Sequence, residues 1–162
     1  MIRLNLGSGD DYKTGFINVD NSPHLKKDLE WDLDSYPYPY QESSVDYIYA
    51  YGIIEHIDNL KQFLEEMYRI LKPGGKIRFR VPMAFTHADA RDPTHKQHIN
   101  PDTFNKFSKT IGVNRITSAR FKPNIWITIP KFHKLKFSRK LYHLNSFITI
   151  FTGVEGILTA VK

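Results

Sequence analysis

The 162-residue chain contains no cysteine, which excludes disulfide bonds, thiolate nucleophiles and zinc–thiolate sites. It has no run of about 18 consecutive apolar residues, so no membrane-spanning helix is expected. Because Met1 leads directly into an apolar strand pattern, no signal peptide is expected either. These absences favour a cytoplasmic protein, with attachment to a membrane surface as the open alternative. The length predicts a single domain over residues 1–162.

Acidic residues are absent between Asp102 and Glu155, and the charge is split along the chain. Residues 1–75 hold seven Lys and Arg against thirteen Asp and Glu, whereas residues 76–162 hold sixteen against four. Within the basic half, residues 131–151 mix cations with bulky apolar side chains, which predicts an insertion or lid. Such a segment suits an anionic membrane surface or RNA, and an ordinary solvated basic face remains open.

The N-terminal pattern predicts a nucleoside-binding crevice. An apolar strand, Leu4 to Leu6, stops in the turn Gly7-Ser8-Gly9, and a second strand, Phe16 to Val19, ends in the carboxylate of Asp20. A glycine turn and an acid at the end of the next strand can hold a nucleoside in a Rossmann-type sheet. The connection is too short for the helix that binds a pyrophosphate, which argues against NAD and ATP. It favours a phosphate-free nucleoside such as S-adenosyl-L-methionine (SAM), although a plain turn between core strands is the alternative.

The whole pattern predicts an α/β, Rossmann-like fold. We expect a mostly parallel sheet of seven strands or a trimmed form of it, with helices on both faces, a shortened first helix and an antiparallel edge strand. The clearest helix has an apolar stripe from Ile57 to Leu71 with Asp58 as its cap. The other expected elements are strands ending near 30–31 and at 45–50, 76–81 and 115–130, a helix over 100–109, and a final edge strand at 155–161.

Six segments in this order resemble the small type-11-like branch of the class I SAM-dependent methyltransferases. They are Leu4 to Gly9, Phe16 to Asp20, Trp31 to Leu33 with Tyr38 to Tyr40, Val45 to Ile57, Leu71 to Gly75, and Asp92 to His95 with Pro101 to Phe104. The resemblance implies SAM as the cofactor, with Asp20 on the ribose hydroxyls and Asp32 on the adenine amino group. The implied cofactor-binding set is Leu6, Gly7, Ser8, Gly9, Asp20, Asn21, Asp32, Leu33, Tyr51 and Gly52.

Methyl transfer to an oxygen requires a group that handles the acceptor proton. Histidines and acids that follow the central strands are the candidates, because ligands bind at the carboxyl edge of such sheets. The predicted catalytic residues are His56, His95 and Glu55, and the predicted acceptor contacts are His87, Asp92, His98 and Tyr38. Asp92, His95 and His98 have the spacing of a weak metal cluster, but loop histidines usually form hydrogen bonds, and no metal site is predicted.

The expected activity is methyl transfer from SAM to an oxygen of a small molecule, glycan or lipid-linked intermediate. Tyr51-Gly52-Ile53-Ile54 stands where amino-directed nucleic-acid methyltransferases carry an Asn/Asp-Pro-Pro-aromatic tetrapeptide. The basic half keeps an RNA methyltransferase as the second hypothesis. A non-catalytic SAM-binding or scaffolding subunit is the third, and a homodimer stays open.

Overall fold

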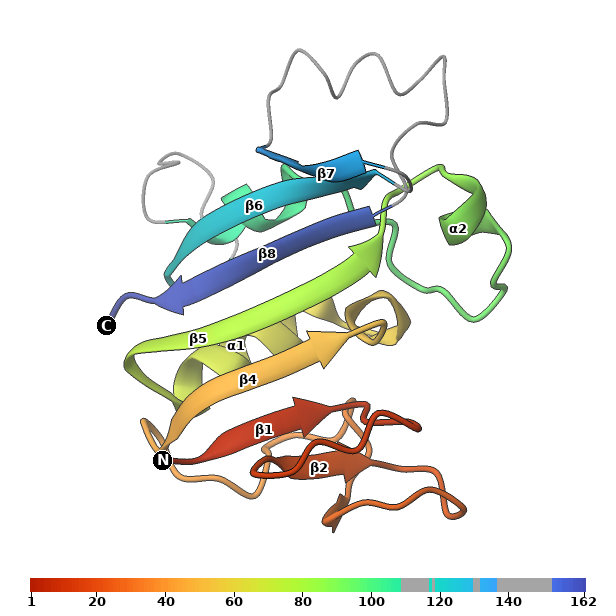
Figure 1. The fold of residues 1–162 in the computed structure, drawn as a ribbon. Helices are drawn as coiled ribbons and strands as arrows, with labels where there is room; N and C mark the ends of the chain where they lie inside the picture. Colours follow the sequence, from red (N-terminus) through yellow and green to blue (C-terminus); the bar gives the residue numbers. More distant parts are fainter. Residues whose placement is uncertain (109–116, 118, 130–131, 137–152) are drawn as a thin grey trace.

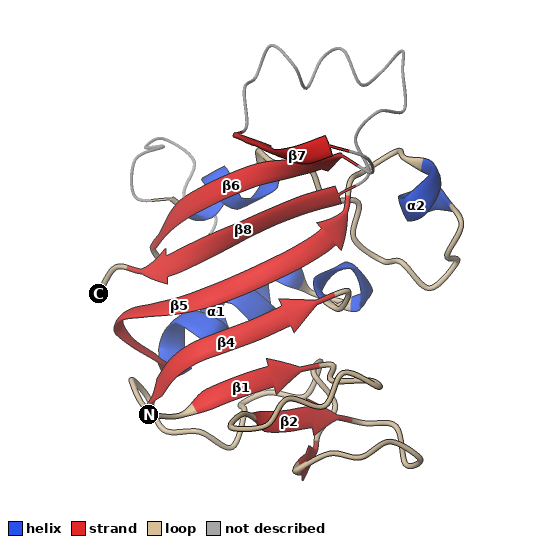
Figure 2. Cartoon of the chain, in the orientation of Figure 1, coloured by secondary structure: helices blue, strands red, loops and turns tan. Residues whose placement is uncertain are grey.

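The computed structural model describes residues 1–108, 117, 119–129, 132–136 and 153–162. The described strands form one eight-stranded sheet in the order β3-β2-β1-β4-β5-β8-β6-β7 (Figures 1 and 2). Neighbours from β3 to β5 pair in parallel, while β8 is antiparallel to both β5 and β6, and β7 is antiparallel to β6. This order confirms the predicted Rossmann-like, mostly parallel sheet.

The element bounds follow the sequence pattern closely in the first half of the chain. The strands are β1 Arg3–Leu6, β2 Ile17–Asp20, β3 Leu29–Glu30, β4 Val45–Tyr51, β5 Leu71–Pro82, β6 Phe121–Ile129, β7 Phe132–Lys136 and β8 Gly153–Ala160. The helices are α1 Leu60–Ile70 and α2 His87–Ala90, with 3-10 turns η1 Ile54–His56 and η2 Thr103–Phe107.

One face of the sheet carries the core. Side chains alternate along β4 and β5, so Ile48, Ile77 and Phe79 point to one side and are fully buried. Helix α1 lies across this side (Figure 1) and buries its apolar stripe there. The ring of Phe104 in η2 lies 4.3 Å from that of Phe79, which places η2 on the same side.

The opposite face differs from the prediction of helices on both sides. Of the described helical segments, α1 and η2 pack on the core face, while the short β1–β2 connection is a loop. The second face therefore carries partly exposed aromatic and basic side chains, among them Tyr47, Tyr49 and Arg78. Phe16 packs edge-on against Tyr47 and Tyr49 and covers part of this face.

The C-terminal half of the fold differs most from the sequence prediction. The final strand was expected at the sheet edge, but β8 lies between β5 and β6, and the antiparallel edge strand is β7. In place of the helix predicted over 100–109, the structure has the short η2. The Asn100 side chain precedes it and accepts hydrogen bonds from the backbone N–H groups of Asp102 and Thr103. Of the predicted lid over 131–151, only β7 lies within the described residues.

Helix α1 also begins and ends differently from the prediction. Its cap is Asn59, which accepts a hydrogen bond from the backbone N–H of Gln62, and not Asp58. Its last residue is Ile70, because Leu71 already pairs with Val45 in the sheet. Within the described part of the chain, no helix is long and apolar enough to cross a membrane.

Candidate functional site

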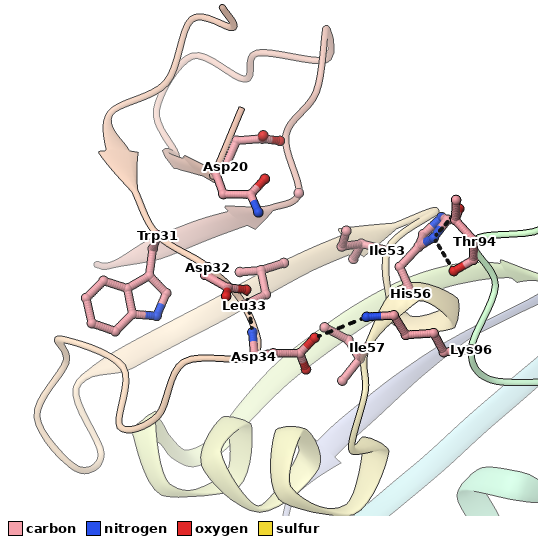
Figure 3. A pocket seen from close by; sticks show the side chains of 12 residues that line it. Asp20, Trp31, Asp32, Leu33, Asp34, Ile53, His56, Ile57, Thr94 and Lys96 are labelled. Atoms are coloured by element: carbon pink, nitrogen blue, oxygen red, sulfur yellow. Dashed lines mark hydrogen bonds and ion pairs between the residues drawn. The ribbon is translucent and has the colours of Figure 1, made fainter. Parts of the chain in front are cut away.

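A cavity of about 300 Å³ opens at the carboxyl ends of β1, β2 and β4 (Figure 3). This is the edge at which open α/β sheets bind their ligands. Its lining comes from the glycine turn, the ends of β2 and β3, the turn η1, and a loop that follows α2. The lining residues are Gly7, Asp20, Asn21, Trp31, Asp32, Leu33, Asp34, Ile53, His56, Ile57, Thr94 and Lys96.

The glycine turn allows the backbone to approach the far wall of this cavity. Gly7 has φ +58°, and a Cβ placed there would lie 2.5 Å from Cγ1 of Ile53. Only glycine therefore fits at this position without displacing the Ile53 side chain. Asn5 holds the short connection in place, because its amide donates to Asn18 Oδ1 at 2.9 Å and to the Asp11 carbonyl at 2.8 Å.

Asp20 is fixed by backbone hydrogen bonds on both carboxylate oxygens. Its Oδ2 accepts from the Gly9 N–H at 2.9 Å and its Oδ1 from the Ser22 N–H at 2.8 Å. Each oxygen retains a further lone pair, so the carboxylate can still accept from a ligand hydroxyl in the cavity. The Ser8 hydroxyl beside it is buried and has no hydrogen-bond partner among the described residues.

Residues 31–34 form the second wall. Asp32 Oδ1 accepts from the Asp34 N–H at 3.0 Å, and the Tyr38 hydroxyl donates to the Leu33 carbonyl at 2.8 Å. Tyr38 itself is only 3% exposed. The Tyr38 hydroxyl therefore supports Leu33, and its role as an acceptor contact stays a prediction.

A second hollow of about 280 Å³ lies on the other side of η1. It is bordered by the end of β4, η1, the ends of β5 and β8, and the loop after α2. The lining residues are Gly52, Glu55, Arg80, Val81, Pro82, Ala88, Arg91, Asp92, His95 and Gly153. His56 lines the first cavity and the adjacent Glu55 lines this hollow, so η1 separates the two spaces.

The three predicted catalytic residues come together at this boundary. One ligand atom from each of Glu55, His56 and His95 lies within 4.8 Å of the other two. Glu55 is 3% exposed, and its Oε2 has no hydrogen-bond partner among the described residues. Burial raises the pKa of Glu55 to about 7, because the charged form loses hydration that the site does not replace.

The loop that carries His95 is joined to η1 through the backbone. The Glu55 carbonyl accepts from the N–H groups of Lys96 and Gln97, at 2.8 and 2.9 Å. Thr94 contacts the His56 ring through its carbonyl and hydroxyl. These contacts place residues about forty positions apart side by side.

The remaining predicted residues lie around these spaces. Gly52 and Asp92 border the hollow, while the exposed His98 contacts Asp89 Oδ2 at 2.9 Å, and His87 is exposed on α2. The Tyr51 ring stacks on Tyr49 and so faces the open side of the sheet. Five members of the predicted cofactor set do not line the first cavity: Leu6, Ser8, Gly9, Tyr51 and Gly52.

Sequence reasoning missed several lining residues. Asp34, Ile53, Ile57, Thr94 and Lys96 border the first cavity, and Arg80 and Arg91 border the hollow. The segments Val45 to Ile57 and Asp92 to His95 offered a signal for Ile53, Ile57 and Thr94, through their family resemblance. Lys96 is fixed by an ion pair of 2.6 Å with Asp58, which holds the pKa of the lysine above its usual range.

Part of the chain, including strands β2 and β4 and helix α1, is similar to known proteins. Residues 11–79 match a family described as a methyltransferase domain. The chain is 31% identical over 78 residues to a Mycolicibacterium smegmatis protein named as a probable S-adenosylmethionine-dependent methyltransferase. Over these residues the chain is similar to the class I SAM-dependent methyltransferases. SAM is the cofactor of this family.

Solved structures share the fold of this chain. A SAM-dependent methyltransferase from Archaeoglobus fulgidus aligns with a TM-score of 0.70 at 18% identity, covering 97% of this chain and 85% of its own. Phosphoethanolamine N-methyltransferase 2 of Haemonchus contortus, in complex with SAM, gives a TM-score of 0.60 at 17% identity, with 99% and 48% covered. The alignment with the Mycolicibacterium protein spans 46% of this chain and 30% of that relative.

Proposed function

We propose that this chain binds SAM in the first cavity and directs methyl transfer to an oxygen of a polar acceptor in the neighbouring hollow. One observation carries the proposal. The Glu55–His56 pair borders both spaces, so an acceptor held against these residues is next to the cofactor cavity. A reacting group and its catalyst held side by side gain much of the rate that an enzyme supplies.

The residues around the first cavity fit SAM. Gly7 allows the turn to approach Ile53 in the cavity wall, and the fixed Asp20 carboxylate suits the two ribose hydroxyls. Asp32 and Leu33 line the same cavity and are the residues we assign to the adenine. When bound, SAM supplies an activated methyl group whose bond to sulfur breaks as a bond to the acceptor oxygen forms.

The hollow favours a polar acceptor that carries negative charge. Arg80 and Arg91 are exposed at its rim, while Glu55 and His95 lie on its inner side. A hydroxyl against Glu55 and His95 would leave an anionic group of the same molecule within reach of the arginines. This chemistry fits an acidic sugar, or a glycan or lipid-linked intermediate with a phosphate.

The test is methyl transfer from radiolabelled SAM to hydroxylated acceptors that differ only in charge, such as a hexose and the matching uronic acid. We expect transfer to the anionic member, with Arg91→Ala raising KM while kcat changes little. Lys106→Ala, an exposed cation of η2 outside the hollow, is the matched control. Equal activity on both acceptors, or equal KM in both variants, would contradict the acceptor assignment.

A groove on the open face of the sheet favours RNA as a second candidate acceptor. The open face of the sheet has a groove of about 700 Å³ that combines the rings of Phe16, Tyr47 and Tyr49 with the basic Lys76 and Arg78. Aromatic and basic side chains in one groove are typical of single-strand binding. Salt-dependent binding of a labelled oligonucleotide, lost in Lys76→Ala, would favour RNA.

SAM binding without transfer to any acceptor would favour a scaffolding subunit.

A further inference from the structure

The cluster of Glu55, His56 and His95 has the composition of a metal site. Two imidazoles and one carboxylate, with a hollow beside them, leave open positions for further ligands. In the sequence, Asp92, His95 and His98 have the spacing of metal ligands, but no metal site was predicted from them. The structure separates that set, since His98 turns to Asp89, and it groups His95 with Glu55 and His56 instead.

Both histidines are oriented as metal-binding histidines are. The Nδ1 of His95 contacts the Asp89 carbonyl at 2.8 Å, and the Nδ1 of His56 contacts the Thr94 carbonyl at 3.3 Å. A backbone carbonyl that accepts from Nδ1–H fixes the ring and leaves Nε2 as an acceptor. Each ring therefore has one nitrogen free to coordinate a cation.

Glu55 supplies the independent observation. The residue is 3% exposed, and its Oε2 is buried without a hydrogen-bond partner among the described residues. A buried carboxylate oxygen without a partner is unfavourable unless an ion or a ligand compensates it. A cation between Glu55 and the two imidazoles would compensate it.

Asp92 completes the surroundings. Its Oδ1 accepts from the backbone and the hydroxyl of Thr94, at 2.9 and 2.6 Å. Its Oδ2 lies 3.8 Å from Nε2 of His95 and also borders the hollow. This oxygen is placed to serve as a fourth ligand from the exposed side.

We propose that Glu55, His56 and His95 bind a divalent transition-metal ion that coordinates the acceptor hydroxyl. Two imidazole ligands disfavour Mg²⁺ and Ca²⁺, which prefer oxygen. Bound to the ion, the hydroxyl ionises nearer neutral pH and releases its proton to solvent. Two ligands of one ion lie at most roughly 4.4 Å apart, so the cluster would contract slightly from its 4.8 Å spread on binding.

This inference rests on the proposed function and identifies how the acceptor oxygen is activated. The experiment uses the full chain, treated with EDTA, freed of the chelator and titrated with Co²⁺, with the bound ion followed by its visible absorption. We expect one Co²⁺ site per chain and a raised Tm. Glu55→Gln and His95→Ala should weaken binding by roughly 100-fold, since each removes a ligand. His24→Ala, an exposed histidine after β2, should bind as the unaltered chain does.

A parallel titration with SAM in EDTA separates the two proposals. Glu55→Gln should bind SAM normally, which also shows that the variant is folded. No Co²⁺ binding by the unaltered chain, or binding by Glu55→Gln and His95→Ala as tight as that of the unaltered chain, would overturn the metal site. The proposed function fails separately, if the chain binds no SAM or transfers no methyl group with any metal present.

Discussion

Replacing Gly7 by alanine tests whether the glycine turn shapes the cofactor cavity. Gly7 has φ +58°, where an alanine costs about 1–2 kcal/mol relative to its ordinary conformations. The new Cβ would also lie 2.5 and 2.6 Å from Cγ1 and Cδ1 of Ile53. Overpacking of this kind costs about 1–3 kcal/mol more. We therefore expect Gly7→Ala to lower the free energy of unfolding by about 2–5 kcal/mol.

Gly74 offers a matched control. It also has positive φ, at +77°, but a Cβ there would meet nothing within 4 Å, and it lies near the start of β5, whereas the cavity opens at the carboxyl ends of the parallel strands. Gly74→Ala should therefore lose only the conformational cost of about 1–2 kcal/mol. Urea denaturation of both variants separates the contact with Ile53 from the backbone strain.

Calorimetric titration with SAM gives the functional readout. Ile53 lines the cavity, so displacing it should weaken SAM binding at least about tenfold in Gly7→Ala, which corresponds to about 1.4 kcal/mol. Gly74→Ala should bind normally, and Ile53→Ala combined with Gly7→Ala should recover part of the loss. If Gly7→Ala binds SAM as tightly as Gly74→Ala does, the close approach of the turn to the cavity wall is not what forms the site.

Two further changes probe the cofactor cavity and the frame behind it. Asp20→Asn should weaken SAM and S-adenosylhomocysteine equally in calorimetric titrations, by about 1.5–3 kcal/mol, because both ligands share the ribose; unequal losses would contradict the ribose assignment. Glu66→Ala should lower the free energy of unfolding by about 2–4 kcal/mol, since the buried carboxylate accepts from the Tyr38 N–H and from Arg69. Urea denaturation measures this change, and a loss below 1 kcal/mol would mean that water replaces these contacts.

The first half of the fold could be predicted because its signals are local. The strand at 45–50 and the helix stripe before Gly74 have periodicities that survive without any partner. The short connection between Gly9 and Asp20 likewise excluded a full helix by length alone. Among the described residues, the lack of a helix over the second face follows from the same short connection.

The place of β8 in the sheet could not be predicted in this way. Its pattern indicates a buried strand, and its burial is indeed continuous from Gly153 to Gly156. Whether such a strand pairs with one neighbour or two depends on the chain before it, which must first form β6 and then return. The pairing of β8 with both β5 and β6 is a long-range outcome that no local pattern records.

The candidate site shows the same division. Asp20 and Gly7 follow from strand ends and turn chemistry, whereas the meeting of His95 with Glu55 depends on a loop about forty residues later in the chain. That loop is held by two backbone N–H groups that donate to the Glu55 carbonyl. Backbone contacts of this kind carry no side-chain signature, so the sequence could propose the members of the cluster but not their arrangement.

Buried polar atoms without hydrogen bonds at the carboxyl edge of the sheet argue for bound ligands there. Folded proteins pair nearly all buried polar atoms, and each unpaired one is unfavourable by about 1–3 kcal/mol. Among the described residues, unpaired buried side-chain oxygens belong to Ser8, Tyr36, Glu55, Asp89 and Thr128. Ser8, Glu55 and Asp89 follow the carboxyl ends of β1, β4 and β5, the edge of the sheet at which the two cavities open. A fold that only had to be stable would replace them with apolar side chains, so their presence is best explained by bound groups that complete their hydrogen bonds and charge.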